Sequence, residues 1–245
     1  MLVIENLNKS FGALQVSHNI SLTIALGQCH AVIGPNGAGK TTLIHQISGV
    51  LLQNSGRILL DGRDISHLSI WQRVHAGLGR TFQITSILPT FSVLENVATA
   101  VQAKEGSSFK FFACATAEVA LNSKAHSILK RVGLDDQADR PAADLSHGEL
   151  RLLEIAIALA VTPKFLLLDE PMAGLGKTES AALIVLLNEL RNEFPMLLVE
   201  HDMDAVFQLA DALSVLVDGR IVAQGSPAEV RDDPQARTAY LGDGG

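Results

Sequence analysis

The sequence predicts an α/β fold with a mostly parallel central sheet, and three features of the chain lead to this fold class. Apolar runs of strand length occur at 29–33, 165–170 and 196–201, each close to turn residues. The two later runs are apolar along most of their length, as expected for strands that are covered on both faces. Helical segments at 178–194 and 203–211 follow these two runs, and strands that alternate with helices are typical of a parallel sheet.

Shorter patterns predict additional strands at both ends of the chain. The runs at 3–7, 20–24 and 57–62 have strand character, and we expect an N-terminal antiparallel β part there. Near the C-terminus, the run at 213–225 is interrupted by Asp218-Gly219. This dipeptide is a strong signal for a two-residue β-hairpin turn.

The strand signal disappears over 88–161, where helical spacing and good helix formers predominate. We therefore expect an all-helical subdomain inserted into the α/β core. The predicted organisation is a single domain with its core at 1–87 and 162–225, the helical subdomain at 88–161 and a C-terminal tail at 226–245.

Composition and charge exclude several classes of protein. Of 245 residues, 47% are hydrophobic and 4% aromatic, which predicts a large aliphatic core. The net charge of −7 argues against a surface that binds nucleic acid by neutralising phosphates. Cys29 and Cys114 form no CxxC pair, so neither a disulfide framework nor a zinc site is indicated, and a reducing cytoplasm is expected. No apolar run approaches the roughly 18 residues of a membrane span, and the N-terminal segment lacks leader features, so we expect neither export nor membrane insertion.

The strongest motif is GPNGAGKTT at 34–42, which matches GxxxxGK[ST] and lies between an apolar strand and a helical segment. The glycines let successive backbone N–H groups point inward, and the following helix adds its positive end, so the loop is expected to bind a phosphate chain. Lys40 would reach the β and γ phosphates, Thr41 would ligate Mg²⁺, and Thr42 would add a hydrogen bond to the α phosphate. The expected ATP-binding residues in this motif are Gly34, Pro35, Asn36, Gly37, Ala38, Gly39, Lys40, Thr41 and Thr42.

A second acidic motif, FLLLDE at 165–170, places two carboxylates at the end of a buried strand. Asp169 would orient the Mg²⁺ shell through water, and Glu170 would take a proton from the attacking water. An apolar run that ends in acids is common by itself. Its position after a phosphate-binding loop gives it a catalytic interpretation.

A third motif, LSHGELR at 145–151, opens a segment with helical periodicity. One interpretation is an ordinary capping box, with Ser146 as the N-cap and Glu149 three residues later. The other is a second anion site at the start of a helix. The residues alone leave both interpretations open.

Five segments occur in the order and spacing of the ATP-binding subunit of ABC transporters, which the chain resembles over almost its whole length. They are GPNGAGKTT, GRTFQ, LSHGE, FLLLDEP and EHD at 200–202. The resemblance implies a RecA-like P-loop NTPase core and hydrolysis of ATP to ADP and phosphate. It also implies a head-to-tail dimer, in which ATP on one P-loop is covered by the signature segment of the other subunit, Ser146, His147, Gly148 and Glu149.

The same resemblance implies roles for individual residues. Glu170 would be the general base, and His201 would contact the γ phosphate and the attacking water. Gln83 would sense Mg²⁺ and couple to the helical subdomain. Phe11 would stack on adenine, although a core aromatic next to the first strand is the alternative.

Within the family, three stretches resemble the ATPases of branched-chain amino-acid importers and their relatives for urea or other small amides: GLGRTFQITSILPTFSVLENV, MAGLGKTE and AYLGD. ATPases of the lipopolysaccharide-export type have a similar C-terminal tail but usually resemble this sequence less around Gln83. The chain departs from the family at His147 and Glu149, where Gly and Gln are common. Glu149 brings a carboxylate near the γ-phosphate site unless it turns to the capping role. Gly176 replaces a polar residue, which bears on communication between the two ATP sites.

The resemblance also implies partners and a location. We expect a second ATPase subunit, identical or homologous, together with transmembrane permeases that dock near Gln83 and, indirectly, a solute-binding protein. The chain would be peripheral at the cytoplasmic face of the membrane.

Three other interpretations fit less of the sequence. ABC ATPases that act on DNA or ribosomes usually have two cassettes, a coiled-coil insertion or a basic extension, and none appears here. A small-molecule kinase would leave LSHGELR, Gln83 and His201 unexplained. A regulatory module that holds ATP without hydrolysing it is kept open by Glu149 and Gly176.

Overall fold

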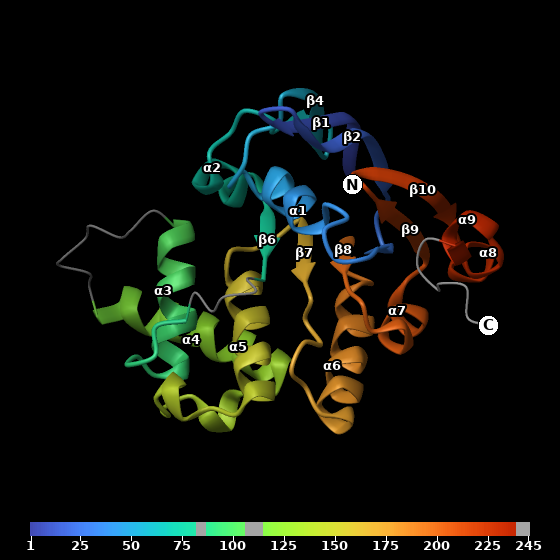
Figure 1. The fold of residues 1–245 in the computed structure, drawn as a ribbon. Helices are drawn as coiled ribbons and strands as arrows, with labels where there is room; N and C mark the ends of the chain where they lie inside the picture. The colour runs from blue at the N-terminus through green and yellow to red at the C-terminus, as the bar shows by residue number, and fades with distance from the viewer. Residues whose placement is uncertain (82–86, 106–114, 239–245) are drawn as a thin grey trace.

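The computed structural model describes residues 1–81, 87–105 and 115–238 and has the expected α/β architecture (Figure 1). Within these residues, a six-stranded sheet is parallel except for the edge strand β10 (Arg220–Gly225), which pairs antiparallel with its neighbour β9 (Ala212–Val217). In spatial order its strands are β10, β9, β3 (Cys29–Ile33), β8 (Met196–Val199), β7 (Phe165–Asp169) and β6 (Leu78–Arg80). A smaller antiparallel sheet contains β2 (Leu14–Ile24), β1 (Leu2–Phe11), β4 (Ser55–Leu60) and β5 (Arg63–Asp64).

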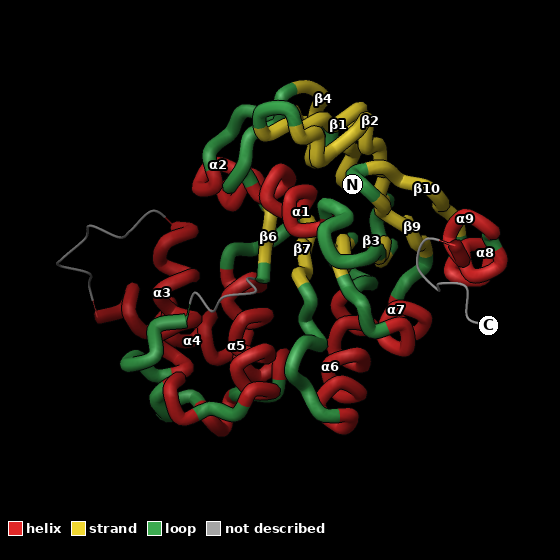
Figure 2. The backbone as a smooth tube through the Cα atoms, in the orientation of Figure 1, coloured by secondary structure: helices red, strands yellow, loops and turns green. Residues whose placement is uncertain are grey.

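Helices cover the larger sheet, and one of them separates the two sheets (Figure 2). The α-helices are α1 (Lys40–Ser48), α2 (Ile70–Ala76), α3 (Val93–Glu105), α4 (Ala115–Val132), α5 (His147–Ala160), α6 (Lys177–Leu190), α7 (Met203–Leu209), α8 (Pro227–Asp232) and α9 (Pro234–Ala236). Short 3₁₀ turns occupy Asp135–Gln137 and Ala142–Asp144. The apolar side of α1, formed by Leu43, Ile44 and Ile47, belongs to one buried cluster with residues of both sheets. α1 is therefore the layer between them.

The central strands are buried on both faces, which explains their continuous apolar sequences. In β7, Phe165 and Leu167 pack in the cluster that contains α1, whereas Leu166 and Leu168 pack in the cluster formed with the helices of the other face. Successive side chains of a strand point to opposite faces, so Asp169 follows Phe165 and Leu167 onto the α1 face. The carboxylate of Asp169, at the end of β7, therefore lies on the side of the sheet that α1 covers.

The sequence predicted the strands of the larger sheet other than β6, and it also missed the helix α2. β6 contains only three residues and is stabilised by its parallel pairing with β7. α2 begins at a capping box in which Ser69 Oγ accepts the N–H of Gln72. Both elements are too short to show a periodic pattern, so only their tertiary partners define them.

The folded chain contains the predicted hairpin and the predicted helical segment. Asp218 and Gly219 have φ angles of 45° and 74°, the left-handed pair that a type I′ hairpin turn requires. Among the described residues of 88–161, the regular elements are helical. None of the helices in the described part of the chain combines the length and the apolar character that a membrane crossing needs.

Candidate nucleotide-binding and catalytic site

The glycine-rich loop joins the end of β3 to the start of α1, where the backbone approaches its neighbours too closely for side chains. A Cβ atom on Gly34 would lie 2.1 Å from the carbonyl oxygen of Leu216. Gly37 and Gly39 have φ angles of 82° and 105°, which favour glycine. The loop conformation therefore depends on glycine at these three positions, as the motif predicted.

Lys40, the first residue of α1, folds back over this loop. Its Nζ donates to the carbonyl oxygens of Gly34 at 2.7 Å and Pro35 at 3.1 Å. Burial lowers the pKa of Lys40, and the nearby charge of Glu170 opposes that shift. Thr41 and Thr42 follow in the first turn of α1, where unpaired backbone N–H groups and the helix dipole favour an anion.

Asp169 lies at the end of β7 and is almost fully buried, with 3% of its surface exposed. Its backbone N–H donates to Thr81 Oγ1 at 3.3 Å, and Arg80 Nη2 lies 3.4 Å from its Oδ2. Burial raises the pKa of Asp169, while the charge of Arg80 acts in the opposite direction. The carboxylate is thus held close to the P-loop helix with a cation next to it.

The structure brings Glu170 and His201 together at the ends of adjacent strands. His201 Nδ1 lies 3.7 Å from Glu170 Oε1. The backbone of Glu170 has a φ of 47°, and its N–H donates to the carbonyl of Val199 at 2.9 Å. Left-handed backbone at a non-glycine residue before a proline, here Pro171, is strained, and such strain is concentrated at functional sites.

Glu200 is a site residue to which the sequence analysis gave no role. Its carboxylate accepts backbone N–H groups from Met172 at 2.8 Å, His201 at 3.0 Å and Asp202 at 3.3 Å. It is 1% exposed, and burial raises its pKa. Glu200 therefore joins the segment after Glu170 to the segment that carries His201. An acid at the end of an apolar strand, directly before that histidine, was the available signal.

At the signature segment, Ser146 and Glu149 form a capping box at the start of α5. Ser146 N–H donates to Glu149 Oε2 at 2.7 Å, and Glu149 N–H donates to Ser146 Oγ at 3.3 Å. Arg140 Nη1 lies 3.5 Å from the second carboxylate oxygen. Glu149 thus takes the capping role, and the exposed His147 follows Ser146 directly.

The signature segment lies beside the start of α6 and away from the P-loop of the same chain. A Cβ atom on Gly148 would meet Glu179 Oε1 at 2.7 Å, which places the first turns of α5 and α6 in contact. Figure 1 shows α6 beginning at the lower end of the molecule, whereas α1 lies near the top. The two predicted anion sites are therefore not brought together within one chain.

Of two further predicted site residues, Phe11 and Gln83, the structure describes only Phe11. Phe11 ends β1 with 51% of its surface exposed, and Lys9 Nζ lies 5.2 Å from its ring centre. Phe11 is therefore not a core aromatic, and its ring is accessible for stacking. Gln83 lies outside the described residues.

The donors near the P-loop suit Mg²⁺. Thr41 offers a hydroxyl and Asp169 a carboxylate, both hard oxygen ligands, and Mg²⁺ commonly uses few protein ligands together with phosphate oxygens and water. Among the described residues, no group of three or more His, Cys, Asp or Glu side chains forms a self-sufficient metal site. The residues present fit an ion that arrives with a nucleotide.

A glycine loop between a strand and a helix, opposite an acidic strand end, defines a P-loop nucleotide-binding protein. The ABC transporter family model matches residues 17–173, and a model described as branched-chain amino acid ATP-binding cassette transporter matches residues 220–245. The chain therefore belongs to the ABC transporter family and is an ATP-hydrolysing subunit of that family.

Individual relatives agree with this assignment. The chain is 37% identical to the high-affinity branched-chain amino acid transport ATP-binding protein LivG of Salmonella typhimurium, over 99% of this chain and 98% of the relative. It is 32% identical to the lipopolysaccharide export system ATP-binding protein LptB of Haemophilus influenzae, with the same coverage. A crystal structure of a nucleotide-free ATP-binding cassette from an ABC transporter superposes with a TM-score of 0.86 at 30% identity, over 99% of both chains.

Proposed function

We propose that this subunit couples Mg²⁺-dependent ATP hydrolysis to the import of branched-chain amino acids or related small polar solutes. The observation that carries the proposal is the match of residues 220–245 to the branched-chain amino acid cassette model, combined with full-length similarity to LivG. The subunit would act at the cytoplasmic face of the membrane as a peripheral protein. Its core would comprise 1–87 and 162–225, its helical subdomain 88–161 and its tail 226–245.

The geometry of the described residues, together with the family resemblance, supports the following hydrolytic roles. Lys40 and the loop N–H groups would bind the phosphates, and Phe11 would stack on the adenine. Thr41 and Asp169 would hold Mg²⁺, which would neutralise charge on the phosphates, and Gln83 would sense it. Glu170 would accept a proton from the attacking water, and the neighbouring His201 would contact the γ phosphate.

A complete site would need two chains. The P-loop and the signature segment of one chain lie at different places in the fold, although both are suited to anions. A head-to-tail dimer would bring Ser146 and Gly148 of one chain to the nucleotide on the other. In this arrangement Glu149 would remain in its capping role.

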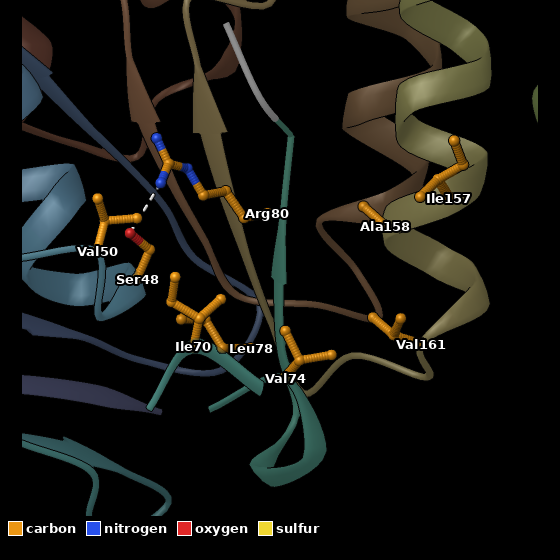
Figure 3. Close-up of a pocket in the computed structure, with 9 residues that line it drawn as sticks. All are labelled: Ser48, Val50, Ile70, Val74, Leu78, Arg80, Ile157, Ala158 and Val161. Carbon is orange, nitrogen blue, oxygen red and sulfur yellow. Dashed lines mark hydrogen bonds between the residues drawn. The ribbon is translucent and has the colours of Figure 1, made fainter. Parts of the chain in front are cut away.

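The permease would dock at the boundary between the α/β core and the helices. An apolar pocket lies there, lined by residues from the end of α1, α2, β6 and α5 (Figure 3). Val50 and Ile70 are 49% and 44% exposed, so apolar surface at this pocket is accessible to a partner. We propose that a cytoplasmic helix of a transmembrane permease inserts apolar side chains here, with a solute-binding protein acting on the far side of the membrane.

Lipopolysaccharide export is the second candidate, because LptB is also similar along its full length. The match of the C-terminal segment to the branched-chain cassette model favours import. The direction of transport and the transported substrate are therefore the two measurements that distinguish import from export.

A Glu170→Gln variant tests the catalytic assignment. We expect loss of at least about 100-fold in the ATP hydrolysis rate, because the general base is lost, with nucleotide affinity retained. Phosphate release and fluorescent-nucleotide binding measure the two quantities, with His67→Gln, at an exposed position between β5 and α2, as the control. A rate for Glu170→Gln close to that of the wild type would remove Glu170 as the base.

Reconstitution tests the transport assignment. The tagged chain would be purified from solubilised membranes together with its permeases and placed in liposomes that contain ATP. Uptake of labelled leucine in the presence of the binding protein, absent with Glu170→Gln, is the expected result. Co-purification of lipid-exporting permeases without leucine uptake would instead support the second candidate.

A further inference from the structure

Arg80 is the last residue of β6, and the strand register places it on the same face as Asp169. β6 pairs in parallel with β7, so that Leu78 lies opposite Phe165 and Arg80 opposite Leu167. Leu78, Phe165 and Leu167 all belong to the buried cluster around α1. Because side chains alternate along a strand, Arg80 and Asp169 both point toward the P-loop helix.

The guanidinium of Arg80 contacts two elements of the site at once. Nη1 donates to Ser48 Oγ at 2.8 Å, a bond visible in Figure 3, and Nη2 lies 3.4 Å from Asp169 Oδ2. Ser48 is the last residue of α1, the helix that begins with Lys40. Arg80 therefore links the far end of the P-loop helix to the carboxylate at the end of β7.

The surroundings of Arg80 make this link strong. The side chains of Arg80 and Asp169 are 7% and 3% exposed. Apolar residues of α2 and α5, including Val74 and Ile157, line the pocket next to Arg80 (Figure 3). Charges that are shielded from water interact more strongly than surface ion pairs, and a planar guanidinium holds its partners in a fixed geometry.

We propose that Arg80 is a positioning residue for the Mg²⁺ site, which fixes the Asp169 carboxylate relative to the P-loop helix. The inference rests on the proposed use of Mg²⁺ with ATP and adds a residue to it. Arg80 contacts neither nucleotide nor metal in this scheme. Without it, Asp169 would remain buried but would lose its fixed orientation toward the nucleotide.

The test compares the affinity for ATP in Mg²⁺ with the affinity in EDTA, using the Glu170→Gln background so that hydrolysis is slow during the measurement. The ratio of the two dissociation constants measures the Mg²⁺-dependent gain in binding. Arg80→Met should reduce this gain by about tenfold or more, as expected for the loss of a buried charged contact. The affinity in EDTA should change by less than about twofold.

Further variants separate positioning from a general structural effect. Arg80→Lys keeps the charge and should recover part of the gain, although an ammonium cannot reproduce the fork between Ser48 and Asp169. Ser48→Ala removes one contact of Arg80 and should reduce the gain by about threefold. Arg57→Met is the matched control, because Arg57 forms an exposed ion pair with Glu5 on the smaller sheet. If Arg80→Met does not fold, Arg80→Lys and Ser48→Ala carry the test.

Two results would overturn the inference. A Mg²⁺-dependent gain in ATP affinity that is equal in Arg80→Met and in its Glu170→Gln parent would show that Arg80 does not position Asp169. Equal losses of affinity in Mg²⁺ and EDTA would show a general disturbance of the nucleotide site. If Mg²⁺ does not raise the ATP affinity of the Glu170→Gln parent itself, the proposed Mg²⁺ site fails together with the inference. If Mg²⁺ raises the affinity of the parent and of the Arg80 variants equally, only the role of Arg80 fails.

Discussion

At the scale of single residues, Glu149 and Glu200 show how the surroundings of one carboxylate determine its use. Both accept hydrogen bonds from backbone N–H groups. For the buried Glu200, desolvation outweighs these bonds and raises the pKa. For Glu149, the bond from the backbone of Ser146 is the largest influence and lowers the pKa.

Replacing Glu149 with Gln should leave the ATP hydrolysis rate within about twofold of the wild type or raise it. Gln also completes a capping box, because its side-chain oxygen can accept the N–H of Ser146. The substitution removes a negative charge from the signature segment, where the γ phosphate would bind. A large loss of phosphate release would show that the acid has an active role.

The same variant should change the pH dependence of stability. The backbone N–H of Ser146 holds the pKa of the Glu149 carboxyl below its ordinary value in the folded chain. Its contribution to stability is therefore complete above the unfolded pKa and is lost as the pH falls through the lowered folded pKa. Urea unfolding at neutral pH and at about pH 4 should show a smaller acid loss for Glu149→Gln than for the wild type.

At the scale of elements, the first turns of α5 and α6 form one structural unit. Glu179 Oε2 accepts the N–H of Gly176 at 3.0 Å, which caps α6. The same carboxylate lies against Gly148, where no Cβ atom could fit without displacing it. Glu179 thus links the end of the loop that follows Glu170 to the signature segment of the same chain.

Gly148→Ala should destabilise the protein by about 1 kcal/mol or less, because displacing the Glu179 carboxylate from its cap is partly offset by the higher helix propensity of alanine. In a Glu179→Ala background the same substitution should cost less than about 0.5 kcal/mol. Urea denaturation of the four proteins in this double-mutant cycle measures the coupling. Additive effects would show that the two turns act independently.

At the scale of the whole molecule, the arrangement of the two anion sites predicts complementation between defective chains. Lys40→Ala damages the P-loop, and Ser146→Arg blocks the signature segment. Each variant alone should be inactive. In a mixed head-to-tail dimer, one composite site combines both defects and the other is intact.

An equal mixture should recover about a quarter of the wild-type rate, since half of the dimers are mixed and each has one working site of two. Phosphate release from the mixture is the measurement. Ultracentrifugation of the Glu170→Gln variant with ATP is the control that this chain pairs with itself. Pairing without recovery of activity would contradict the shared site.

The sequence by itself determined the phosphate-binding loop, the acidic strand end and the fold class. These features follow from local chemistry: glycines permit the loop backbone, apolar runs require cover on both faces, and alternation along β7 assigns Asp169 to the face of Phe165 and Leu167. The hairpin turn at Asp218-Gly219 is equally local. The shared site of a dimer came from family resemblance and remains a prediction.

Only the tertiary structure decided which distant groups meet. Glu200 became a site residue through three backbone N–H groups from two loops, and Arg80 through Ser48 and Asp169. The choice between capping and anion binding for Glu149, and the contact of Gly148 with Glu179, also required the folded chain. The physical reason is that hydrogen bonds and ion pairs depend on distances of a few ångströms between segments. The register of β6 on β7, for example, sets the distance between Arg80 and Asp169 only after the sheet has formed.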